Sequence, residues 1–250
     1  MIRPPHEPLD LSIVLPCRNE EASIERVVAG ALEQGARIAH RLEVIAVDDG
    51  SRDATGAIAD RLAASDRRVR ALHNAPGLGY GGALTAGFRA ATCPWIFYTD
   101  ADGQFDLSQL REAIALLARC DVVAGFRAAR VESGVRRAGG RLWTAIVGRV
   151  FGLSVRDLDC AFKLLPRSVV EEGPPGDLGA LLSRGALVSA ELLYRAQVLG
   201  LRITEMPVRH LPRRAGRATG ASPGVIARAG LELLTLPARI RSQARRRPSG

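Results

Sequence analysis

Several residue types and patterns are scarce in this chain of 250 residues, and each absence narrows the range of functions. Aromatic residues make up only 4% of the chain, too few for the stacking platform of a protein that binds single-stranded nucleic acid. The four cysteines lie far apart without a CxxC pair, and no apolar leader is recognisable, so we expect a reduced, cytoplasmic protein. The most apolar stretch, Leu142 to Val155, contains Arg149 and is too short to cross a bilayer.

Most of the chain also lacks a net positive charge, although the formal net charge of the whole chain is +9. Residues 207–250 contain ten arginines and one acid, a balance of 10 − 1 = +9, so residues 1–206 are neutral. A neutral body argues against a nucleic-acid-binding module, whose surface would be basic. Lysine is nearly absent, because Lys163 is the single lysine among 35 basic residues, so the abundance of arginine alone says little about function.

Apolar runs alternate with segments of helical periodicity along the chain. We expect strands at Leu11–Leu15, Leu42–Val47, Val69–Leu72, Trp95–Thr99, Asp121–Gly125, Ala161–Leu165 and Arg202–Val208. We expect helices at Asn19–Leu32, Ala57–Leu62, Leu107–Ala118, Gly134–Gly152 and Ser189–Leu199, and an amphipathic helix from Ser222. This order predicts an α/β fold with a mostly parallel sheet, helices on both faces, and function in the loops after the strands.

The domain organisation predicted from these patterns is one α/β domain with a C-terminal extension. The predicted parts are an N-terminal extension at 1–9, the catalytic domain at 10–210, an arginine loop and amphipathic helix at 211–238, and a basic disordered tail at 239–250.

Two acidic pairs directly follow predicted strands, Asp48-Asp49 and Asp100-x-Asp102. Parallel strands end at one edge of a sheet, so these carboxylates should converge. Side chains at i and i+2 of an extended segment share one side. Asp100 and Asp102 therefore offer hard oxygen ligands to Mg²⁺ or Mn²⁺, with Gln104 as a third, and such an ion would also hold diphosphate oxygens. For either pair alone, a simple turn after a strand is the alternative.

Four motifs in register carry a resemblance to a known family. They are Leu15–Glu21 (LPCRNEE), Val47–Ser51 (VDDGS), Asn74–Gly87 and Thr99–Gln104 (TDADGQ). The set resembles the family 2 glycosyltransferases of GT-A fold, and within them the dolichyl-phosphate mannose synthase branch and its bacterial polyprenyl-phosphate relatives. This resemblance covers about Leu9 to Leu236. It implies a metal-dependent, inverting enzyme that moves a hexose from GDP-mannose or a UDP-hexose to a polyprenyl phosphate.

The resemblance also implies which residues bind the nucleotide sugar. These are Pro16, Arg18, Glu20, Asp48, Asp49, Gly79, Asp100 and Ala101, with Asp102 both catalytic and a metal ligand. Carboxylates suit this role because they accept hydrogen bonds from a base N–H or a ribose hydroxyl. The chain departs from the family at Arg18, where many members carry an aromatic residue.

The acceptor side is expected to be cationic. A phosphomonoester is already an anionic nucleophile, so groups that hold it matter more than a general base. In similar synthases the arginine after the strand, here Arg127, and one in the next helix, here Arg136 or else Arg137, contact the acceptor phosphate, and planar guanidinium groups suit that contact. Lys163 is predicted as a further cation. Arg213 resembles the arginine that closes over the diphosphate.

Two other activities can be distinguished from transfer to a lipid phosphate by particular residues. Transfer to a hydroxyl acceptor would need a base, for which Asp157 and Asp159 are the candidates. A dinucleotide-binding oxidoreductase is disfavoured because Gly79–Leu84 lacks the final glycine of its signature.

We also predict that the basic C-terminal tail holds the enzyme peripherally on anionic headgroups at the inner face of the plasma membrane, with a solvated tail as the alternative.

Overall fold

The structure is a computed structural model that describes residues 9–128, 134–170, 181–183, 185, 187–213, 230, 232–233, 235–236 and 238–239, with 134–138 described by backbone only. Its centre is a seven-stranded sheet in the order β3-β2-β1-β4-β6-β5-β7. The strands are β1 (Leu9–Cys17), β2 (Ala39–Asp48), β3 (Val69–His73), β4 (Trp95–Thr99), β5 (Val122–Arg127), β6 (Phe162–Pro166) and β7 (Ile203–Val208). Strand β6 runs antiparallel to β4 and β5, and the other pairs are parallel.

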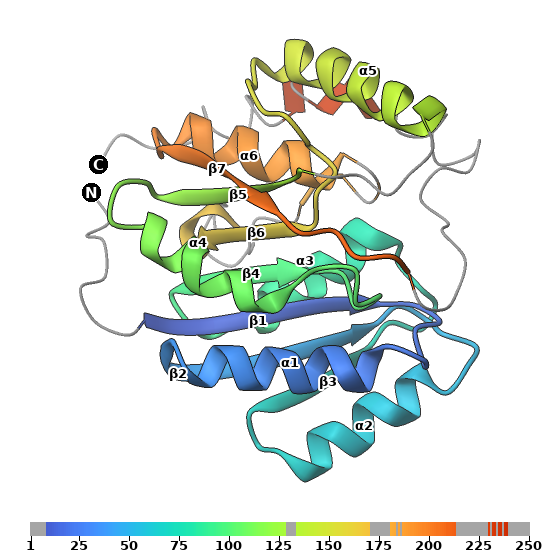
Figure 1. Cartoon of the computed structure of the whole chain (residues 1–250). Coiled ribbons are helices and arrows are strands. Elements are labelled where there is room, and N and C mark those ends of the chain that lie inside the picture. The colour runs from blue at the N-terminus through green and yellow to red at the C-terminus, as the bar shows by residue number, and fades with distance from the viewer. Residues whose placement is uncertain are drawn as a thin grey trace.

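Helices cover both faces of this sheet (Figure 1). They are α1 (Ile24–Ala36), α2 (Thr55–Ser65), α3 (Tyr80–Ala90), α4 (Leu110–Leu116), α5 (Gly134–Phe151) and α6 (Val188–Val198), with 3₁₀ turns at Leu107–Gln109 and Arg167–Val169. In Figure 1, α1 and α4 lie in front of the sheet and α3 lies behind it. The predicted α/β fold, with a mostly parallel sheet, is therefore confirmed.

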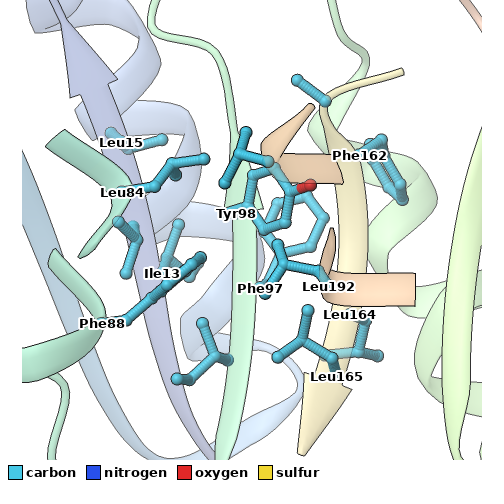
Figure 2. Packing of buried hydrophobic residues seen from close by; sticks show 14 of the residues in the cluster. Ile13, Leu15, Leu84, Phe88, Phe97, Tyr98, Phe162, Leu164, Leu165 and Leu192 are labelled. Carbon is cyan, nitrogen blue, oxygen red and sulfur yellow. The ribbon is translucent and has the colours of Figure 1, made fainter. Parts of the chain in front are cut away.

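The central strand β4 is buried along its whole length, and its side chains pack on both faces of the sheet. On one face the ring of Tyr98 meets Phe88 of α3 edge to face at 5.7 Å, and its hydroxyl lies 3.1 Å from Ser189 of α6. On the other face Phe97 packs against Phe162 of β6 at 4.7 Å (Figure 2). The apolar core thus extends through the sheet and fixes the strand ends that carry the candidate site.

Helix α3 is an element that the glycine-dense sequence does not predict. Glycine is unfavourable inside a helix, but here its small size is needed for packing. A Cβ on Gly87 would lie 2.3 Å from Cγ1 of Val14 and 3.1 Å from Cγ2 of Val47. The helix therefore approaches β1 and β2 closely, and this tertiary contact outweighs the poor local propensity.

The C-terminal predictions fall largely outside the described residues. This applies to the arginine loop beyond Arg213, to the start of the amphipathic helix and to the basic tail. Leu236 is buried, and the hydroxyl of Ser183 donates to Glu232 at 2.9 Å. None of the helices in the described part of the chain is long and apolar enough to span a membrane.

Candidate active site at the carboxyl edge of the sheet

The candidate site lies at one edge of the sheet. There the carboxyl ends of β1, β2, β4 and β5 meet the amino end of β6, because β6 runs the opposite way and pairs its first residue, Phe162, with Thr99. The loops that leave this edge carry the four motifs. The predicted convergence of the acidic pairs on one edge therefore follows from the observed topology.

The loops after β1 and β2 hold each other by hydrogen bonds. The backbone N–H of Asn19 donates to the Ser51 hydroxyl at 2.9 Å, and the Asn19 side chain accepts from the Arg52 N–H at 2.8 Å. The N–H of Glu20 donates to the Thr55 hydroxyl at 2.8 Å. Asn19 has φ of 55°, a conformation that asparagine tolerates better than most residues. Beside these loops Pro16 is buried and Arg18 is exposed.

Asp49, the second residue of the acidic pair after β2, organises the glycine-rich loop. Its carboxylate accepts from the side chain of Asn74 at 3.0 Å and from the N–H groups of Leu78 at 2.7 Å and Gly79 at 2.8 Å. A Cβ on Gly77 would lie 2.4 Å from the carbonyl oxygen of Asp49, so this close approach requires glycine. Both Asp49 oxygens therefore hold the loop that leads into α3.

Asp48 contacts its own turn and His73 on the neighbouring strand. It accepts from the N–H of Ser51 at 3.0 Å and lies 3.3 Å from Nδ1 of His73. Hydrogen bonds to Asp60 first and to Asp48 second raise the pKa of His73. Asp48 thus lies beside a group that becomes cationic more readily than an ordinary histidine.

Asp100 and Asp102 form a crowded carboxylate pair after β4. Burial, followed by the charge of Asp102, raises the pKa of Asp100 to about 7. The hydroxyl of Tyr80, the first residue of α3, donates to Oδ1 of Asp100 at 2.8 Å. Between the two acids, the carbonyl of the buried Ala101 accepts from Ser23 at 2.8 Å, which fixes the backbone. Such a pair favours the presence of a cation.

Arg213 forms an ion pair with Asp102 and with Glu20. Its Nη2 lies 3.0 Å from Oδ2 of Asp102 and 2.8 Å from Oε1 of Glu20. Burial raises the pKa of Glu20, against the opposing effect of Arg213. One guanidinium group therefore joins the segment after β7 to the loops after β1 and β4.

Gln104 and Phe105 hold the segment after β7 in place. The Gln104 side chain donates to the carbonyl of Leu211 at 3.0 Å, and the Leu211 N–H donates back to the Gln104 carbonyl at 2.7 Å. Phe105 and His210 form an isolated antiparallel bridge.

No group of three or more His, Cys, Asp or Glu side chains suited to a metal occurs among the residues that can be described. A protein-only metal cage is therefore not formed there.

Arg127, at the end of β5, forms a bidentate ion pair with Asp157. Its Nε and Nη2 lie 2.7 Å and 2.9 Å from the two carboxylate oxygens, and its backbone N–H donates to the same group at 3.2 Å. Both side chains are largely buried. Asp157, a candidate base, is therefore an ion-pair partner of Arg127, whereas Asp159 is exposed in a turn.

Lys163 is predicted as a cation of the acceptor site, but it lies inside the fold. Its side chain is fully buried, and Nζ donates to the carbonyls of Leu158 and Cys160 and to the hydroxyl of Ser189. These contacts hold the ammonium group inside the fold, so in this structure it is not presented to an acceptor phosphate. The side chains of Arg136 and Arg137 lie outside the described residues.

Comparisons with known proteins identify the family of this chain. The model of the family "Glycosyl transferase family 2" matches residues 12–173, more than half of the chain. The chain belongs to glycosyl transferase family 2. The family expected from the four motifs is thereby confirmed.

Curated relatives of this family 2 chain include glycosyltransferases from archaea and bacteria. Glycosyltransferase AglD of Haloferax volcanii is 33% identical over 213 residues, covering 82% of this chain and 34% of that protein. Undecaprenyl-phosphate mannosyltransferase of Micrococcus luteus is 30% identical over 202 residues, covering 75% of this chain and 79% of that protein. The chain therefore spans about a third of the first relative and most of the second.

Solved structures show the same fold. Glucosyl-3-phosphoglycerate synthase of Mycobacterium tuberculosis has a TM-score of 0.67 at 20% identity, covering 92% of this chain and 80% of that one. The same synthase solved with Mn²⁺, UDP and glucosyl-3-phosphoglycerate has a TM-score of 0.62 at 20% identity, covering 97% of this chain and 82% of that one.

Two residues that contact the candidate site of this family 2 chain are missed by sequence reasoning. Tyr80 contacts Asp100, and Ser23 contacts the backbone of Ala101. Tyr80 stands inside the glycine-dense motif, which is the only local signal for it. Both contacts join elements far apart in the chain, so only the fold reveals them.

Proposed function

We propose that this family 2 glycosyltransferase moves a hexose, with inversion, from GDP-mannose or a UDP-hexose to a polyprenyl phosphate. The observation that carries the proposal is the meeting of the Asp100–Asp102 pair with two arginines at one sheet edge. Arg127 and Arg213 both lie close enough to Asp100 to lower its pKa against the larger effect of burial. Such an edge suits a donor diphosphate beside an anionic acceptor.

The donor is proposed to lie between the loops after β1, β2 and β4. Pro16, Arg18, Glu20, Asp48, Asp49 and Gly79 would border the nucleoside. Asp100 and Asp102, with the side-chain oxygen of Gln104, would hold Mg²⁺ or Mn²⁺, and the donor set fits because both acids offer hard oxygens in a site with excess negative charge. When bound, the ion would offset the diphosphate charge and so stabilise the leaving group.

Transfer itself needs one displacement. An oxygen of the acceptor phosphate attacks C1 of the sugar from the face opposite the diphosphate, the C1–O bond to the diphosphate breaks, and the nucleoside diphosphate leaves with the bonding electrons. The phosphate is already anionic, so no side chain has to remove a proton. The Arg127–Asp157 ion pair favours this route over a hydroxyl acceptor, because Asp157 is engaged with Arg127.

A thermal-shift panel tests the donor half of this proposal. The chain would be heated with GDP- and UDP-sugars, with and without Mn²⁺. We expect one nucleotide to raise the melting temperature, and more so with Mn²⁺, because a ligand that binds only the folded state stabilises it. Equal melting temperatures with all nucleotides, at millimolar ligand and with Mn²⁺ present, would contradict the donor assignment.

Tyr80→Phe is expected to weaken metal binding without removing a ligand. The variant loses the 2.8 Å hydrogen bond to Asp100, and loss of such a supporting contact typically lowers metal affinity about tenfold or more. The measurement is Mn²⁺ titration by calorimetry with nucleoside diphosphate present. Tyr98→Phe is the control, because it also loses a buried hydroxyl contact, here to Ser189. Equal Mn²⁺ affinities for the two variants would remove Tyr80 from this role.

Arg213→Ala is expected to have opposite effects on metal binding and transfer. Mn²⁺ without nucleotide should bind roughly threefold to tenfold tighter, because a competing cation has left Glu20 and Asp102. Transfer should fall by about 10- to 100-fold, because the diphosphate loses a charge-assisted hydrogen bond. Arg209→Ala is the control, since Arg209 is exposed and pairs with Asp106. Unchanged values for Arg213→Ala in both assays would exclude the arginine from the site.

A further inference from the structure

We propose that the outward face of α5 docks on an anionic lipid surface. Leu142, Ile146 and Val150 lie on this face with 63%, 45% and 39% of their surface exposed. They are spaced four residues apart, so they form one ridge along the helix. We call these three residues the α5 ridge. The other exposed large hydrophobic residues in the described part of the chain, Leu78, Val198 and Leu211, belong to three different segments.

The opposite face of α5 anchors the helix to the domain. Thr144, Val147 and Phe151 are buried, and the ring of Phe151 packs edge to face on Tyr194 of α6 at 5.4 Å. Figure 1 shows α5 at the outer border of the molecule, beyond α6. Helix α5 therefore packs on the domain through a separate buried face, and the α5 ridge is not needed for that packing.

The charge of α5 identifies the kind of partner. Its sequence, Gly134–Phe151, contains four arginines and no acidic residue. Of these, Arg141 and Arg149 are described and exposed. In helical projection Arg149 falls beside Leu142, and Arg141 falls on the same side of the ridge, at the far edge of the exposed face. An apolar ridge with a cationic border along one side matches a helix that lies in the plane of an anionic headgroup layer.

The position of α5 links this surface to the acceptor. The helix begins shortly after Arg127, which ends β5. Arg156, just beyond its C-terminus, is exposed and lies over the ring of Phe126 at 4.5 Å. If the acceptor is a lipid phosphate, docking through α5 brings the Arg127 end of the sheet to the level of the headgroups. The inference rests on the proposed function in this respect alone.

Vesicle binding tests the ridge. Full-length protein would be sedimented with vesicles of phosphatidylglycerol and phosphatidylcholine, and with vesicles of phosphatidylcholine alone, none of which contains polyprenyl phosphate. Leu142→Glu/Ile146→Glu should lower the partition coefficient for the anionic vesicles at least roughly tenfold, because two apolar side chains no longer enter the bilayer. Val198→Glu is the control, as it changes an exposed aliphatic residue of α6 and should bind as the parent does.

The charged border is tested separately. Arg141→Glu/Arg149→Glu should lower anionic-vesicle binding by at least about 25-fold, because each arginine near such a surface contributes ~1 kcal/mol. Arg111→Glu/Arg119→Glu, which reverses two exposed arginines around α4, should reduce binding less than fivefold. A series with Arg245, Arg246 and Arg247 changed to Gln measures the contribution of the basic tail in the same assay.

Three results would overturn the inference. The first is parent-like vesicle binding by both α5 variants. The second is loss of binding in the tail series alone. The third is a parent dimer in light scattering that Leu142→Glu/Ile146→Glu converts to monomer, which would assign the ridge to a second copy of the chain. Melting temperatures within a few degrees of the parent confirm folding. A failure of the proposed function would look different: the chain would transfer no sugar to a short soluble acceptor, while α5-dependent vesicle binding would stay intact.

Discussion

Asp102→Asn is expected to lower sugar transfer by roughly 10²- to 10³-fold, because it removes a charged oxygen from the place where diphosphate charge develops. Asparagine keeps the size of the side chain, and its oxygen can still accept the Gln104 N–H that Asp102 accepts at 3.0 Å. The fold should therefore persist. The measurements are initial rates with labelled nucleotide sugar and Mn²⁺ titration with nucleoside diphosphate present, and both should show the loss.

Asp106→Asn is the matched control for this variant. Asp106 lies in the same loop, accepts from Ser108 and pairs with Arg209, and has no place in the proposed site. Asparagine caps a helix about as well as aspartate, so stability should change little, and turnover should stay within about twofold of the parent. Equal turnover in Asp102→Asn and Asp106→Asn would contradict the assignment of the carboxylate pair.

Separate changes of Arg127 and Asp157 are expected to weaken the acceptor interaction. Arg127→Gln should raise the KM for polyprenyl phosphate by about 10- to 100-fold, because a hydrogen bond to a charged group is lost. Asp157→Asn should act in the same direction, because the bidentate partner at 2.7 Å and 2.9 Å no longer fixes the guanidinium group. The double variant should be little worse than Arg127→Gln, since the two residues act as one unit.

The pattern of kinetic effects distinguishes positioning from base catalysis. A base at Asp157 would lower kcat and change the pH dependence of kcat/KM, whereas a positioning residue changes mainly the KM for the acceptor. The control is Asp121→Asn, which weakens a similar pair with Arg202 at the other end of β5. Both aspartate variants should lose stability. A selective fall in kcat for Asp157→Asn, with the acceptor KM unchanged, would favour a hydroxyl acceptor.

The succession of strands and helices along the chain and the acidic edge are predictable from sequence because they depend on local patterns. Buried parallel strands appear as short apolar runs, and polar residues directly after them must reach the same edge. This pattern predicts that Asp48, Asp100 and Asp102 follow strands at one edge, and β2 and β4 do end at the same edge of the sheet, with β1 between them. The structure also brings Glu20 and Arg213 together, although 193 positions separate them, and no local pattern could show that contact.

Other features depend on long-range packing and were not predictable. The antiparallel direction of β6 is set by pairing with β4 and β5, not by its own sequence. Lys163 lies within the apolar run of that strand and is predicted as a site cation, yet it donates to buried carbonyls of the turn before β6. Helix α3 packs closely on β1 and β2 because Gly87 carries no side chain there. In each case the deciding partner is distant in sequence.

The central claim is sugar transfer to a lipid phosphate, and one acceptor comparison tests it most directly. The chain would be incubated with Mn²⁺ and the nucleotide sugar selected by thermal shift, and given either a short polyprenyl phosphate or the corresponding polyprenol. Products would be identified by mass spectrometry. We expect a glycosyl phosphodiester from the phosphate and no product from the alcohol. Glycosylated polyprenol, or no lipid-linked sugar with any donor in the panel, would contradict the claim.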